Sequence, residues 1–313
     1  MRILHIENQA GVAFQLAQAQ KRMGHEALVA ETWANAIQEP HDREFYYTHA
    51  SLGKDLFNGL ELIKFAQGFD IIHVHGGLHW KRWDALALKL GLRKPLVVHY
   101  HGSEARDGYG MHYGSLADHK YISRPDLFRW VPDGEYVPNP VGEHPYSFDM
   151  EKRPRVIHMA TNRRAKGTDL IEKALQELTE EGLDFDHIVL QNVDHQRAME
   201  ELAGSHILID QVIDVSKVGI PSIIGLASFE AMAMGKVAIS TFDEEYRKYY
   251  PGCPVITIDP DAKALKSAVR EAVRNLESVK ELGLAGREYV RREHSADVIV
   301  QRIMPVYRSL LSK

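Results

Sequence analysis

The sequence contains a single cysteine, Cys253, so no disulfide can form within the chain, as is usual in a reducing compartment. It also lacks any run near the ~18 apolar residues that a membrane-spanning helix needs. Neither sign of charge is in excess, because 38 Lys and Arg residues are balanced by 43 Asp and Glu residues, a net charge of −5. This balance gives no case for nucleic-acid binding or for strong attraction to an anionic membrane. We therefore expect a cytoplasmic protein, with at most peripheral contact with the inner face of a membrane.

The 313 residues are 44% hydrophobic and 26% charged, a composition typical of globular proteins large enough for two domains. Short apolar runs alternate with amphipathic stretches in both halves of the chain, which predicts parallel sheets covered by helices. The predicted strands span residues 2–6, 27–30, 70–75, 95–101, 156–160, 187–191, 207–210 and 237–240. The clearest predicted helices span residues 11–23, 168–181, 196–203 and 228–234, the second of them capped by Thr168.

A proline-rich polar stretch from residue 138 to 154 predicts the linker between two domains. We place an N-terminal domain at residues 1–145, a C-terminal domain at 146–295 and a last helix at 296–313, which we expect to pack back on the first domain. The predicted fold class is α/β, with two Rossmann-like parallel-sheet domains facing each other across a central cleft. Ligands bind beyond the carboxyl ends of such strands, so functional residues should lie at strand ends.

The segment 225–236 places small residues directly before a predicted helix. The free amides of a helix N-terminus suit a pyrophosphate, so Gly225, Leu226, Ala227 and Ser228 are predicted contacts of a nucleoside diphosphate. Glu230, predicted in the first helical turn, could accept hydrogen bonds from two ribose hydroxyls. The alternative is a buried helix start, at which Glu230 only complements the helix dipole.

Three cations, Arg163, Arg164 and Lys166, lie between a predicted strand and the next helix. They would repel the positive end of the helix dipole unless an anion joined them, and a diphosphate supplies that anion. The alternative is a solvated basic loop. Lys166 is the favoured contact, whereas the choice between the two arginines stays open.

Histidines occur in pairs at alternate positions near two predicted strand ends: His73 and His75, then His99 and His101. Side chains two residues apart in a strand point to the same face. Four histidines could ligate zinc, but no acidic partner has suitable spacing, so we predict no metal and treat all but His101 as structural. Gly11, between a strand and a helix, would allow close approach of sugar-donor phosphate or acceptor, or simply mark the helix start.

The segment 229–237, Phe-Glu-Ala-Met-Ala-Met-Gly-Lys-Val, resembles the sugar-donor helix of retaining glycosyltransferase family 4, which has the GT-B fold. Four further segments resemble the family in order and spacing: 10–13 with 24–26, 70–76, 99–104 and 137–141. The resemblance implies transfer of a hexose from a nucleoside diphosphate sugar to an acceptor hydroxyl, with retention by front-face substitution and with no cofactor or metal. The implied acceptor is a glycan, a lipid-linked molecule or a small molecule.

Residue by residue, the resemblance places Glu230 on the ribose, Lys166 with one arginine on the diphosphate, and His101 beside the transferred sugar. His101, Lys166 and Glu230 are thus the predicted catalytic residues. The family usually has a second glutamate eight positions before Glu230, where this chain has Ser222. Asp210 is a possible substitute for that carboxylate. The departure at Ser222 keeps two alternatives open: a non-catalytic subunit that binds a nucleotide sugar, and a nucleotide-sugar 2-epimerase.

Overall fold

The computed structural model describes residues 1–33, 40–76, 83–108, 114–219 and 221–312. The chain divides into two compact units, one made of Met1–Pro140 with Ala296–Lys313, the other of Val141–Ser295. Each unit contains one sheet in which every pair of neighbouring strands is parallel, so the predicted α/β class is confirmed. The division falls at Pro140, slightly before the predicted boundary at residue 145.

The N-terminal unit has a seven-stranded sheet in the order β3-β2-β1-β4-β5-β6-β7. Its strands are β1 (Arg2–Ile6), β2 (Glu26–Glu31), β3 (Arg43–Glu44), β4 (Ile71–His75), β5 (Leu96–Tyr100), β6 (His119–Ile122) and β7 (Glu135–Tyr136). Its helices are η1 (Gln9–Gly11), α1 (Val12–Arg22), α2 (Leu52–Ala66), α3 (Trp83–Leu86), η2 (Ala87–Gly91), α4 (Ser103–Arg106), η3 (Pro125–Arg129) and α13 (Ala296–Leu311). Strands β1, β4 and β5 are buried almost throughout, which explains their near-continuous apolar runs.

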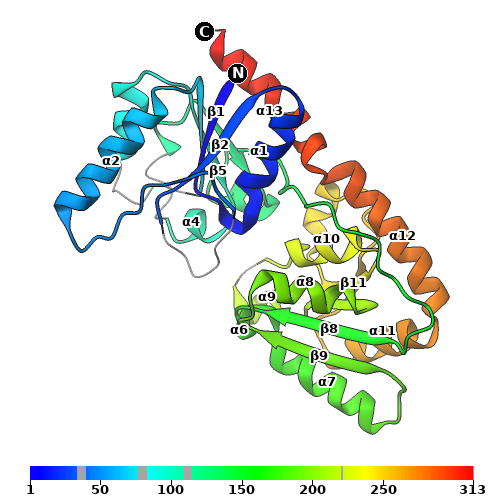
Figure 1. The fold of residues 1–313 in the computed structure, drawn as a ribbon. Helices are drawn as coiled ribbons and strands as arrows, with labels where there is room; N and C mark the ends of the chain where they lie inside the picture. The colour runs from blue at the N-terminus through cyan, green and yellow to red at the C-terminus, as the bar shows by residue number, and fades with distance from the viewer. Residues whose placement is uncertain (34–39, 77–82, 109–113, 220, 313) are drawn as a thin grey trace. The chain divides into compact units, whose positions relative to one another are not determined.

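Helix α13 returns from the end of the chain and lies beside α1 (Figure 1). Its buried face, with Ile299, Val300, Ile303 and Tyr307, shares one core with the apolar face of α1 and one side of the sheet. The N-terminal unit is therefore completed by the last helix of the chain.

The C-terminal unit has a five-stranded sheet in the order β12-β11-β10-β8-β9. Its strands are β8 (Arg155–Ala160), β9 (Asp186–Gln191), β10 (Ile207–Gln211), β11 (Val237–Thr241) and β12 (Ile256–Ile258). Its helices are α6 (Arg163–Lys166), α7 (Thr168–Glu180), α8 (His195–Ala203), α9 (Val215–Val218), α10 (Leu226–Ala233), η4 (Glu244–Tyr249), α11 (Ala262–Arg274) and α12 (Leu276–Glu293). Since β9 pairs on one side of β8 and β10 on the other, the order of the strands reverses at the β8/β10 pair.

Two local predictions are corrected. The loop predicted around the three cations contains the one-turn helix α6, whose N-cap Asn162 accepts a hydrogen bond from the amide of Ala165 (3.0 Å). Thr168 does not cap α7, because the N-cap is Gly167 and the Thr168 hydroxyl contacts buried His158 instead (2.8 Å). None of the described helices is both long enough and apolar enough to cross a membrane.

Candidate functional site

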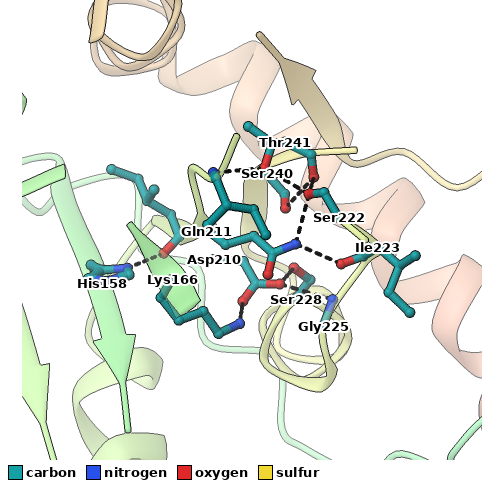
Figure 2. Close-up of polar contacts among 12 residues, drawn as sticks. His158, Lys166, Asp210, Gln211, Ser222, Ile223, Gly225, Ser228, Ser240 and Thr241 are labelled. Carbon is teal, nitrogen blue, oxygen red and sulfur yellow. Dashed lines mark hydrogen bonds and ion pairs between the residues drawn. The ribbon is translucent and has the colours of Figure 1, made fainter. Parts of the chain in front are cut away.

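The strongest cluster of predicted site residues lies at the reversal point of the C-terminal sheet. In such sheets, ligands bind where the strand order reverses, beyond the carboxyl ends of the strands. Lys166 follows β8 through α6, and Asp210 lies at the end of β10. Their side chains form an ion pair, Lys166 Nζ to Asp210 Oδ1 (Figure 2). Two residues that are 44 positions apart in the sequence are thus brought together at the expected place.

Asp210 also binds the N-terminus of α10. Its Oδ2 accepts hydrogen bonds from the Gly225 amide (3.0 Å) and the Ser228 hydroxyl (2.8 Å) (Figure 2). Burial would raise the pKa of the Asp210 carboxyl, but the Lys166 ammonium and these hydrogen bonds hold it below its ordinary value. The carboxylate is therefore ionised and fixed between a cation and a helix N-terminus.

Gly225 is required by this arrangement. A Cβ atom there would lie 2.6 Å from Asp210 Oδ2, closer than real Cβ contacts allow. The first turn of α10 that follows is partly exposed at Leu226 and Ala227. Among the described contacts, the amides of these two residues have no acceptor, as expected in the first helical turn. They remain available to an anion, next to the Lys166 ammonium.

Lys166 is held by its backbone as well as by Asp210. Its carbonyl accepts a hydrogen bond from the Val212 amide (3.0 Å), which ties α6 to the end of β10. Gly167 then turns the chain at φ 70°, where a Cβ atom would lie 1.9 Å from the Val212 carbonyl oxygen. Only glycine fits this approach. The backbone that carries the Lys166 side chain is therefore held against Val212 both at Lys166 and at Gly167.

The two predicted arginines have different surroundings. Arg163 forms ion pairs with Asp169 (2.6 Å) and with Glu172 on α7, so its charge is already neutralised. Arg164 is exposed and has no ion-pair partner within the described ranges of the chain. Of the two, Arg164 is the one whose guanidinium can meet an added anion.

Ser222 is buried and its hydroxyl is bound within the protein. It accepts a hydrogen bond from Gln211 Nε2 (3.0 Å) and donates one to the Thr241 carbonyl oxygen (2.8 Å). Thr241 Oγ1 lies 2.8 Å away, and with the Ser222 proton already used, the threonine hydroxyl is the donor of that contact. Ser222 joins the ends of β10 and β11 to the segment before α10 (Figure 2).

Glu230 lies in the second turn of α10, one turn later than predicted, because the helix begins at Leu226 and not at Ser228. Its Oε1 is 2.8 Å from His195 Nε2, a contact that the sequence did not suggest. Glu230 is mostly buried, while about half of the His195 side chain is exposed. The sequence position of His195 could have identified it as a site residue, because His195 begins α8 just after the end of β9, a strand of the same sheet.

The remaining two predicted residues lie in the N-terminal unit. Gly11 is the buried N-cap of α1 with φ 71°, and Asn8 accepts the hydrogen bond of the Phe14 amide (3.0 Å). Both ring nitrogens of His101 are engaged, Nδ1 with Asn139 Oδ1 (2.9 Å) and Nε2 with His75 Nδ1 (3.1 Å). His101 thus points into a cluster of histidines, and a hydrogen bond from it to a sugar would require one of these contacts to open.

Comparisons with known proteins bear on the family resemblance and on the fold. A family model described as Glycosyltransferase Family 4 matches residues 9–134. The resemblance to glycosyltransferase family 4 is confirmed. No curated protein sequence matches the chain.

The fold is GT-B, as in glycosyltransferases of known structure. Sucrose-phosphate synthase from Thermosynechococcus elongatus is 18% identical, with a TM-score of 0.67 over 100% of this chain and 99% of that one. HepE from Anabaena, in complex with UDP-glucose, is 14% identical, with a TM-score of 0.68 over 99% and 100%. UDP-GlcNAc 2-epimerase from Neisseria meningitidis, bound to UDP-GlcNAc, is 11% identical, with a TM-score of 0.63 over 99% and 100%. At these identities the likeness establishes the fold alone.

Proposed function

We propose that the protein transfers a hexose from a nucleoside diphosphate sugar to an acceptor hydroxyl, with retention and without a metal on the diphosphate. The observation that carries this proposal is the convergence at the β8/β10 reversal point. There, the Lys166 ammonium and the unpartnered amides of Leu226 and Ala227 surround one position beside ionised Asp210. An ammonium and a helix N-terminus together suit a diphosphate, and Asp210 keeps the ammonium aimed.

The same groups can stabilise the leaving diphosphate. Breaking the bond between sugar and phosphate builds negative charge on the phosphate oxygens, next to Lys166 and the α10 N-terminus. Arg164 is exposed on the same one-turn helix and can add a bidentate contact. Groups that are fixed before the reaction need no rearrangement as charge develops, and each is worth on the order of 3 kcal/mol. The protein's own cations thus take the place that a metal has in other transferases.

Glu230 and His195 serve the nucleoside end of the sugar donor. The Glu230 carboxylate can accept hydrogen bonds from the two ribose hydroxyls, and His195 holds it in place at 2.8 Å. The partly exposed His195 ring lies just after β9, where it can also contact the base. HepE supports this assignment, since its structures contain UDP and UDP-glucose on the same fold.

The sugar end of the site has no carboxylate at position 222, since Ser222 is bound within the protein. We infer direct front-face substitution, in which the departing phosphate helps to deprotonate the acceptor hydroxyl. A glycosyl-enzyme intermediate would need a nucleophilic carboxylate close to a second acid. The acceptor would be a glycan, a lipid-linked molecule or a small molecule.

The experiment that tests the function is a turnover screen with a panel of nucleoside diphosphate sugars, with and without mixed acceptor hydroxyls. We expect release of the nucleoside diphosphate together with a new α- or β-glycoside of the sugar donor's own anomeric configuration. Sugars bound without any turnover would support a non-catalytic subunit. Deuterium incorporation at C2 of the sugar in D₂O would instead support a 2-epimerase, the kind of enzyme that the Neisseria neighbour is.

A further inference from the structure

Five histidines of the N-terminal unit lie together on β1, β4 and β5 or directly after β5: His5, His73, His75, His99 and His101. Ring centroids of neighbouring members are 4.3–5.7 Å apart. All but His101 are fully buried. Rings that are buried against one another exclude water and repel each other's charge, so the neutral form is favoured. Neutral imidazole is also the form that binds metals.

Three of the rings form a chain that ends in an amide oxygen on both sides. His5 Nε2 contacts Gln20 Oε1 (2.8 Å), and His5 Nδ1 contacts His75 Nε2 (2.9 Å). His75 Nδ1 contacts His101 Nε2 (3.1 Å), and His101 Nδ1 contacts Asn139 Oδ1 (2.9 Å). Each of these four contacts needs one proton, yet three neutral imidazoles carry only three. One contact in the chain would thus set two lone pairs against each other, unless a cation lies there.

His99 indicates where the cation lies. Its Nε2 is 3.3 Å from the Val137 carbonyl oxygen, which can only accept, so the proton is on Nε2 and Nδ1 carries a lone pair. That Nδ1 is buried and has no partner among the described residues. One ring nitrogen each from His75, His99 and His101 lies within 4.8 Å of the other two. The histidine with the unpartnered lone pair is therefore a member of the same group of three as the 3.1 Å contact between His75 and His101.

We propose that His75 Nδ1, His99 Nδ1 and His101 Nε2 bind a single divalent transition-metal ion, best matched by Zn²⁺. Tetrahedral zinc with bonds of 2.0–2.1 Å separates its ligand nitrogens by about 3.4 Å, close to the His75–His101 spacing of 3.1 Å. The fourth ligand of the ion would be a water molecule, which can enter beside His101 because this is the partly exposed member of the cluster. All three ligands belong to the N-terminal unit, so the proposal does not depend on the groups proposed for the diphosphate.

With the ion in place, every hydrogen bond of the chain has one donor and one acceptor. His75 donates from Nε2 to His5 Nδ1, and His5 donates from Nε2 to Gln20. His99 donates to the Val137 carbonyl and His101 to Asn139. Each metal ligand thus has its other ring N–H fixed by an acceptor, which is the usual outer support of zinc-binding histidines.

A second group of three, His5, His73 and His75, is a less suitable site. It is fully buried, so water cannot reach a fourth position, and His73 Nδ1 is already 2.5 Å from the Tyr307 hydroxyl. The Gln20 amide offers an arrangement without a metal ion: turned by 180°, it would donate from Nε2 to His5 and supply the missing proton. A measurement of metal binding distinguishes this arrangement from the proposed zinc site.

The test is metal binding by the full chain after removal of metals with a chelator. When zinc is added back, we expect about one equivalent of bound Zn²⁺ by elemental analysis and a rise in melting temperature. When Co²⁺ is added in place of zinc, we expect the visible absorption bands of tetrahedral Co²⁺. His99→Gln should weaken zinc binding at least tenfold and abolish the thermal shift, while its metal-free form melts like the metal-free wild type. His73→Gln and exposed His187→Gln serve as matched controls that retain binding. The proposal is overturned by a wild type that binds no zinc, by unchanged binding in His99→Gln, or by a loss confined to His73→Gln.

Discussion

Asp210 and Lys166 are bound to each other at the point where the strand order of the C-terminal sheet reverses. Asp210 is buried, whereas a quarter of the Lys166 side chain is exposed. The pair therefore couples a fixed internal anion to a cation that can reach a ligand. Its two members have separable roles, and variants can tell them apart.

Lys166→Met should lower kcat about 10²–10³-fold, because one preorganised stabiliser of the leaving diphosphate is lost. It should also destabilise the protein, because Asp210 would remain buried without its cation. Adding Asp210→Asn should restore part of that stability in urea unfolding but none of the kcat. Lys280→Met is the matched control and should change neither, since Lys280 lies on α12, is partly exposed and pairs with the more exposed Glu277. Full activity in Lys166→Met would remove the lysine from the mechanism.

Glu230→Gln should specifically weaken recognition of the ribose. We expect wild type to bind a nucleoside diphosphate about tenfold or more tightly than its 2′-deoxy analogue, since a hydrogen bond to a charged group contributes ~1.5–3 kcal/mol. The variant should bind both ligands with similar affinity, which calorimetry can measure. If wild type and Glu230→Gln discriminate equally between the two ligands, the ribose hydroxyls do not bind Glu230.

Gly225→Ala should destabilise the C-terminal unit by about 1–3 kcal/mol and reduce affinity for the sugar donor, because the new Cβ would meet Asp210 Oδ2 at 2.6 Å. Both Asp210 oxygens are engaged, so the carboxylate cannot move without losing a contact. Gly53→Ala in α2 is the control, since a Cβ there has no atom within 4 Å. It should be neutral or stabilise by about 0.5–1 kcal/mol. Chemical unfolding curves of both variants decide the matter.

The buried carboxyl of Glu7 should make stability fall as pH rises. Burial raises its pKa to about 8, and the Glu31 charge adds to this rise, against the hydrogen bond from the Thr32 hydroxyl. Because the pKa is raised in the folded state, this contribution is fully present below about pH 4.5 and is lost as pH passes through about 8. Relative to wild type, Glu7→Gln should therefore gain stability progressively over this range. A pH-independent difference in urea midpoints would contradict the assignment.

The sequence predicted the strands that are short apolar runs buried in their sheets, as at β1 and β8. It missed the short strands β3, β6, β7 and β12, which are only partly buried or exposed. It predicted the start of α10 two residues late. The N-cap is Gly225, whose amide hydrogen bond is accepted by Asp210, fifteen positions earlier. Such a contact depends on the register of the sheet, which local periodicity does not contain.

The candidate site was predicted in the same uneven way. Lys166 and Asp210 were identified by their position at strand ends, but their pairing and the internal role of Ser222 arise from tertiary contacts. The contact between Glu230 and His195 joins α10 to the start of α8, 35 positions apart. Histidine spacing placed the pairs on common faces, yet gave no sign that His5 joins them from β1.

Helix α13 has a consequence for how the chain is made. The apolar face of α1 is covered by a helix that leaves the ribosome only after the whole of Val141–Ser295. At ordinary synthesis rates this delay is roughly ten to thirty seconds. The second unit can finish folding during translation, whereas the first must wait with part of its core open. Its nascent form is thus the stage at which chaperones are most needed.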